Sequence, residues 1–120
     1  MKRILIVDEN ELNVDLLVQL LEDEYELIIA WDGAQAVELA AQEKPDLILM
    51  DMAMPVMDGW EATRRIKDQD SLQEIPILGL SSYAMVGDAE KALKAGCDDY
   101  LTKPLDEELL REKLNHFLKD

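Results

Sequence analysis

The chain has 120 residues, and its 12 lysines and arginines stand against 27 aspartates and glutamates, giving a formal net charge of −15. This length suits one domain, residues 1–120, with its own hydrophobic core. The negative charge argues against direct binding to nucleic acid or to an anionic membrane, because phosphate groups would be repelled.

Short apolar runs alternate with helical patterns along the chain. Most of these runs lack polar residues at alternate positions, which is typical of strands buried on both faces of a parallel sheet. The five predicted strands are "RILIV" (3–7), "YELIIA" (25–30), "DLILM" (46–50), "PILGL" (76–80) and "DYLT" (99–102). Apolar residues spaced three and four apart predict five helices, within residues 12–21, 36–40, 60–66, 89–93 and 105–118.

Strands that alternate with helices predict an α/β fold, a doubly wound parallel sheet covered by helices on both faces. Turn-forming residues fall at the joints between these elements, at Gly33, Asp58-Gly59, Gly96 and Pro104. Asp58 is placed to cap the third helix, and Gly96 to end the fourth in a left-handed turn. These signals favour a single domain without internal repeats.

The single cysteine, Cys97, excludes an internal disulfide. The first apolar run is too short for the core of a secretory signal, and none is long enough to span a bilayer. We therefore expect a reducing, cytoplasmic location. We expect Cys97 to be a packed residue, because no histidine or cationic cluster adjoins it in the sequence.

Polar residues follow the predicted strands at the point where each strand ends. The first strand leads into Asp8-Glu9, the third into Asp51, the fourth into Ser81-Ser82 and the fifth into Lys103-Pro104. Ligands of open parallel sheets bind at this edge, so these groups should converge there. Clustered carboxylates repel one another unless a cation neutralises them, and oxygen ligands favour Mg²⁺ or Mn²⁺. The pattern indicates phosphoryl chemistry, in which an aspartate can itself be the nucleophile.

Each of these residues also has a plainer interpretation. Asp8 and Glu9 would stabilise a following helix through its dipole, and Asp51 could be an ordinary loop acid. Ser81 alone would be a turn residue, and Lys103 alone a solvated side chain. Their joint placement at successive strand ends is what favours a functional site.

The sequence resembles the receiver domains of two-component response regulators along essentially its whole length. The resemblance rests on "ILIVDEN", "PDLILMDMAMPVMDGWEATRRIK", "IPILGLSSYAM" and "KAGCDDYLTKPL". It implies the CheY-like, flavodoxin-like fold, with five parallel strands in the order 2-1-3-4-5 and five helices. The opening "DENELN" is most similar to receivers of hybrid kinases and phosphorelays, so both a stand-alone regulator and one domain of a longer protein remain open.

The resemblance also implies a role for each site residue. Asp51 would be the phosphoacceptor. Glu9, Asp51 and the backbone carbonyl of Ala53 would bind Mg²⁺, with Mn²⁺ as a possible substitute, and Asp8 would assist through a water. Ser81 and Lys103 would bind the phosphoryl group, with a cis peptide bond before Pro104. The resemblance implies two further roles. Tyr100 would be the switch aromatic, and Tyr83 and Ala53 lie where the family tunes the lifetime of its phosphoryl group.

The implied function is a phosphorylation-dependent signalling switch, not an enzyme with a separate substrate, that promotes its own phosphorylation and dephosphorylation. A histidine kinase or a histidine phosphotransfer protein would be the donor. A downstream protein would bind the surface of the fourth helix, fifth strand and fifth helix.

Three other functions share parts of this pattern. Glu9 stands where the family has a second aspartate, which keeps open a degenerate receiver that only binds partners. An aspartyl phosphatase would need an acid two residues after the nucleophile, where this chain has Ala53. A flavin carrier would need a glycine-rich phosphate loop after the first strand, where "DENEL" would repel an anion.

Overall fold

A computed structural model describes residues 1–52, 57, 59–81, 94, 96–102 and 105–118. Its strands are β1 (Arg3–Val7), β2 (Glu26–Ala30), β3 (Leu47–Asp51), β4 (Ile77–Ser81) and β5 (Asp99–Thr102). The α-helices of the described part are α1 (Glu11–Leu21), α2 (Gly33–Glu43), α3 (Gly59–Lys67) and α5 (Glu107–Leu118), and a short 3₁₀ helix covers Asp70–Leu72. The helix predicted within residues 89–93 lies outside the described residues, and so do Tyr83, Asp58 and the Lys103–Pro104 bond.

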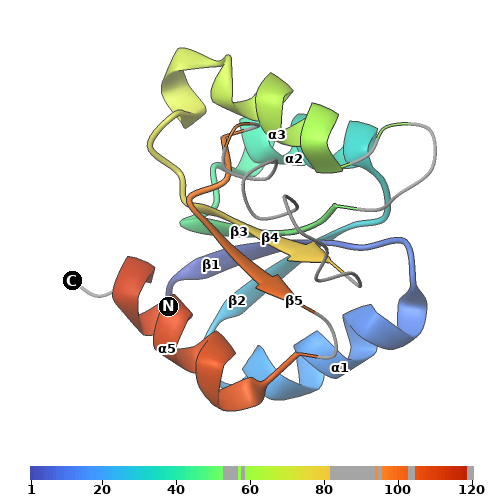
Figure 1. The fold of residues 1–120 in the computed structure, drawn as a ribbon, viewed down its shortest axis with the longest axis vertical. Helices are drawn as coiled ribbons and strands as arrows, with labels where there is room; N and C mark the ends of the chain where they lie inside the picture. Colours follow the sequence, from blue (N-terminus) through green and yellow to red (C-terminus); the bar gives the residue numbers. More distant parts are fainter. Residues whose placement is uncertain (53–56, 58, 82–93, 95, 103–104, 119–120) are drawn as a thin grey trace.

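The strands form one parallel sheet in the order β2-β1-β3-β4-β5, which confirms the predicted topology. Helices α2 and α3 cover one face of the sheet and α1 and α5 cover the other (Figure 1). Each face therefore has its own apolar core, one built with Leu5, Val7, Ile48 and Met50 and the other with Ile4, Ile6, Leu47 and Leu49. The alternation follows from the pleat, which points successive side chains to opposite faces.

The predicted strands lie within one residue of the observed ones. The predictions for β3 and β4 end one residue early, so that Asp51 and Ser81 are the last residues of their strands. Every residue of these two central strands is buried, whereas most of the edge strand β2 is partly exposed. No helix in the described part of the chain is long and apolar enough to cross a membrane.

Local signals set the helix ends. Asn10 caps α1 by accepting hydrogen bonds from the backbone N–H groups of Leu12 and Asn13, and Asp32 caps α2 in the same way. Gly96 has φ +114, the left-handed conformation that the sequence predicts there.

The buried face of α1 differs from the one the leucine spacing suggests. Val14, Leu17 and Leu21 face the core, while Leu12 is 77% exposed and Leu16 49% exposed. The helix has more leucines than one stripe can bury, so its packing against the sheet decides which of them face water.

Candidate functional site

Two carboxylates lie next to each other at the carboxyl end of the sheet. Asp51 ends β3 and Asp8 directly follows β1, and these strands pair with Val7 opposite Met50. Asp8 is 1% exposed and Asp51 5% exposed. Adjacent strands are about 4.8 Å apart, so this register places the two acids side by side. Leu49, two residues before Asp51 in β3, belongs to the core under α1 and α5, so by the pleat Asp51 lies toward that face.

The turn after β1 holds Asp8 in place. Its backbone N–H donates to the Ala30 carbonyl at 3.2 Å, which extends the sheet by one step beyond β1. Its Oδ1 accepts the backbone N–H of Asn10 at 2.9 Å. Asn10, not Asp8, is the N-cap of α1, and the expected interaction of Asp8 with the helix dipole stays a prediction.

Glu9 differs from its neighbour Asp8, because it is exposed to solvent. Ala53, which supplies the predicted carbonyl ligand, lies outside the described residues. Among the residues that the structure describes, no group of three or more Asp, Glu, His or Cys side chains is placed to hold a metal ion. The described acids at this edge are Asp8 and Asp51, whose carboxylates are buried, and Glu9, which is exposed. They fit Mg²⁺, which usually keeps several waters and binds proteins through one or two carboxylates.

Helix α3 begins against the backbone of the candidate phosphoacceptor. The Gly59 N–H donates to the Met52 carbonyl at 3.3 Å. A Cβ on Gly59 would lie 2.4 Å from the Asp51 carbonyl oxygen and 2.6 Å from the Met52 Cα, so only glycine allows this approach. The sequence marks Asp58-Gly59 as a joint, but this contact with Asp51 is visible only in the fold.

Ser81 ends the next strand and is 6% exposed. Met52, the residue after Asp51, donates its N–H to the Leu80 carbonyl at 2.9 Å, so the end of β3 and the end of β4 stay paired. Leu80 belongs to the core under α1 and α5, and the pleat therefore directs Ser81 toward the opposite face. Asp51 and Ser81 thus reach the edge of the sheet from its two sides.

Tyr100 lies in β5, the edge strand at which the sequence places it. It is half-buried and packs against the core under α2 and α3, on the side of the sheet to which Ser81 is directed. Lys103 and Tyr83 fall outside the described residues, so their roles stay predictions.

The fold and this edge define a class: a flavodoxin-like α/β protein with buried acids beyond the carboxyl ends of β1 and β3. The sequence model of the response regulator receiver domain matches residues 4–115. The chain belongs to this family, and the predicted resemblance is confirmed.

Relatives of known name support the same conclusion. The chain is 39% identical over 120 residues to the polar-differentiation response regulator DivK of Brucella anthropi, covering 99% of this chain and 98% of the relative. It is 37% identical to the receiver domain of the sensor histidine kinase PA1611 from Pseudomonas aeruginosa, with a TM-score of 0.91 and coverage of 99% and 98%; that structure has magnesium coordinated in its active-site cleft. It is 31% identical to the Saccharomyces cerevisiae Ssk1 receiver domain, solved with the histidine phosphotransfer protein Ypd1, with a TM-score of 0.89 and coverage of 97% and 88%.

Proposed function

We propose that this receiver domain is a phosphorylation-dependent switch in which Asp51 accepts the phosphoryl group. The observation that carries the proposal is the placement of Asp8 and Asp51, two buried carboxylates at the ends of paired strands. Two carboxylates close together repel each other, and a bound cation would offset that repulsion.

In the proposed reaction, a carboxylate oxygen of Asp51 attacks phosphorus. A P–O bond forms as the P–N bond of a phosphohistidine donor breaks, or as the P–O bond of a small acyl phosphate breaks. Asp51, Glu9 and the Ala53 carbonyl would hold Mg²⁺, or Mn²⁺ in its place, and Asp8 would assist through a water. The cation would offset the charge of an anionic nucleophile approaching an anionic donor.

The remaining site residues would respond to the phosphorylation of Asp51. Ser81 would donate a hydrogen bond to the phosphoryl group, and Lys103 would pair with its charge. Tyr100, on the same side of the sheet as Ser81, would change its position with that of Ser81. A downstream protein would then bind the surface of the fourth helix, β5 and α5, and Tyr83 would affect how long the phosphoryl group persists.

The donor in this proposal is a histidine kinase or a histidine phosphotransfer protein in the cytoplasm. Two similar structures support it: PA1611 is itself a sensor histidine kinase, and Ssk1 was solved with a phosphotransfer protein. Residues 1–120 would act as one receiver unit.

The first prediction tests the phosphoacceptor. Asp51→Asn should abolish phosphoryl incorporation from acetyl phosphate with Mg²⁺, because an amide is not a nucleophile for phosphorus here. Intact-protein mass spectrometry measures the incorporation, and Trp60 fluorescence with beryllofluoride gives a second signal, since Trp60 follows the Gly59 that contacts Asp51.

Asp15→Asn is the matched control, because Asp15 is an exposed aspartate of α1. It should be labelled like the unmodified sequence. Full labelling of the Asp51 variant would contradict the acceptor assignment. If the unmodified chain takes no label from any donor, the degenerate receiver that only binds partners becomes the better function, an alternative that the solvent-exposed Glu9 favours.

A further inference from the structure

The edge strand β5 is preceded and opened by two consecutive acids, Asp98 and Asp99. Each acid forms an ion pair with a lysine of a different helix: Asp98 with Lys67 of α3, and Asp99 with Lys113 of α5. These helices cover opposite faces of the sheet (Figure 1). The start of β5 is therefore attached to both helical layers.

Asp99 makes two contacts with its two carboxylate oxygens. Oδ2 accepts a hydrogen bond from Lys113 Nζ at 2.7 Å, and Oδ1 accepts the backbone N–H of Tyr100 at 2.8 Å. β5 is the last strand of the sheet, so an N–H on its outer edge has no further strand to donate to. One carboxylate thus joins the backbone of Tyr100 to the second turn of α5.

Asp98 makes the corresponding contacts on the other face. Its Oδ2 accepts the Ile77 N–H at 2.8 Å and Lys67 Nζ at 3.1 Å. Lys67 also donates to the carbonyls of Gln73 and Ile75, at 3.0 and 2.8 Å. This pair attaches α3 to the start of β4, and it leaves α5 untouched.

We propose that Asp99 is a positioning residue that makes β5 and α5 one mechanical unit, so that a displacement at Tyr100 is transmitted to α5. The proposal rests on the proposed function, because the displacement is the one that phosphorylation of Asp51 would cause. It goes beyond that function by naming the contact that carries the change from the strand to the helix.

The geometry gives a physical reason for this coupling. β5 has four residues and one neighbouring strand, so few sheet hydrogen bonds hold it. Leu110 and Leu114 of α5 pack on the common core and would let the helix slide over it, since apolar contacts are not directional. A short charge-assisted hydrogen bond is directional, and it fixes α5 to the residue next to Tyr100.

The test uses hydrogen exchange measured by mass spectrometry on the whole chain, without modification at first. Lys113→Met keeps the aliphatic stem and removes the charge, and it should speed exchange in both residues 99–102 and residues 107–118, by up to about fivefold. Lys113→Arg should restore the slow exchange. Lys67→Met is the matched control, and it should speed exchange in α3 and β4 while α5 stays unchanged.

Faster exchange in α5 alone, with β5 unchanged, would overturn the proposal. The proposal would also be overturned if Lys113→Met changed the exchange rates equally in the unmodified chain and in the Asp99→Asn variant. A contact between the two residues requires that the effects of the two substitutions on exchange are not additive.

The second arm repeats the hydrogen-exchange measurement after treatment with acetyl phosphate and Mg²⁺, and intact-protein mass spectrometry measures the phosphoryl incorporation. In the unmodified sequence, β5 and α5 should change together; in Lys113→Met, incorporation should persist while the change in α5 is lost. A persisting α5 change in the labelled variant overturns the coupling and leaves the phosphoacceptor proposal intact. Failure of the unmodified chain to take up label overturns the phosphoacceptor proposal and the role of Asp99 in signalling, and the first arm still decides whether the strand and helix form one unit.

Discussion

Cys97 shows at the scale of one residue how burial sets reactivity. The thiol is buried, and its Sγ lies 3.9 Å from Thr63 Oγ1. Burial raises the pKa of the Cys97 thiol to about 11, and the hydrogen bond between Cys97 and Thr63 opposes that shift only partly. The thiol therefore stays neutral at physiological pH, which confirms the expectation from sequence that Cys97 is a packed residue.

This shift predicts a pH dependence of stability. The thiol has a pKa of about 9.0 in the unfolded chain and about 11 in the folded one, so between these pH values the folded state holds more protons. The free energy of unfolding should fall as the pH rises through this window, by about 1–2 kcal/mol from Cys97. Urea unfolding at pH 8 and pH 10.5 would measure the fall.

Cys97→Ala is the control for other groups that titrate at high pH. Burial also raises the pKa of Tyr25, and the contribution of Tyr25 to the pH dependence of stability is the same in both proteins. The stability advantage of the unmodified chain over the alanine variant should shrink at high pH. A difference that stays constant between the two pH values would contradict this account.

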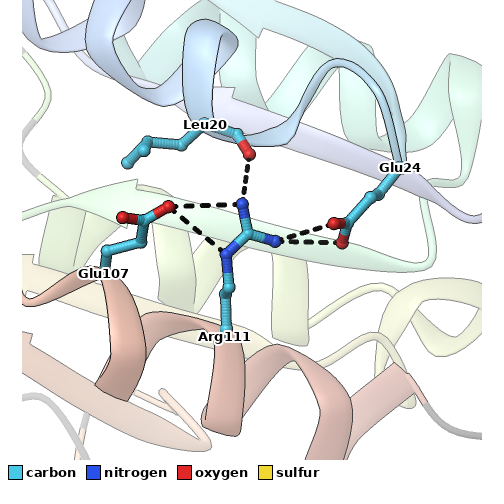
Figure 2. Close-up of polar contacts among 4 residues, drawn as sticks. All are labelled: Leu20, Glu24, Glu107 and Arg111. Carbon is cyan, nitrogen blue, oxygen red and sulfur yellow. Dashed lines mark hydrogen bonds and ion pairs between the residues drawn. The ribbon is translucent and has the colours of Figure 1, made fainter.

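At the scale of elements, one arginine joins two helical segments that are distant in sequence. Arg111 of α5 donates from Nη1 to both carboxylate oxygens of Glu24, at 3.0 Å each, and from Nη2 to the Leu20 carbonyl at 2.8 Å. Longer bonds of 3.4 Å from Nε and Nη2 reach Glu107 (Figure 2). All five donors of the guanidinium are used, and they attach α5 to the end of α1.

Arg111→Lys should lower the free energy of unfolding by about 1 kcal/mol, because an ammonium group cannot reproduce the fork that meets Glu24 and Leu20 together. The expected loss in the free energy of unfolding is small because the Arg111 side chain is 35% exposed and solvent screens its ion pairs. Urea unfolding measures it. Arg65→Lys, in the exposed pair with Glu61, should change stability by less than about 0.5 kcal/mol, and equal losses in the two variants would refute a special role for Arg111.

At the scale of the whole molecule, the net charge of −15 dominates the long-range electrostatics. The described ion pairs satisfy individual basic residues, but they leave a large excess of acids that repel one another in the compact state.

Added NaCl should therefore stabilise the fold, because a shorter Debye length weakens repulsion between surface acids. With EDTA present, raising NaCl from about 10 mM to about 200 mM should raise the melting temperature by a few degrees, equivalent to about 1 kcal/mol. Neutralising the exposed acids Glu11, Asp15 and Glu108 with their amides should reduce this gain. A melting temperature that falls with salt would show that specific ion pairs outweigh the repulsion.

The sequence by itself determined the strands, their order by family resemblance, and the acids at their carboxyl ends. These features depend on local information: runs of apolar residues, turn-forming residues, and the short motifs that follow each strand. The predicted fold was therefore close to the observed one, with strand ends displaced by a single residue at Asp51 and Ser81.

The tertiary structure alone decided how these elements meet. It set which leucines of α1 face the core, the register that brings Asp8 beside Asp51, and the approach of Gly59 to Asp51. It also joined Arg111 to Glu24 across 87 residues, and Asp99 to Lys113. Such contacts depend on the packing of whole helices against the sheet, and no pattern within a short stretch of chain encodes them.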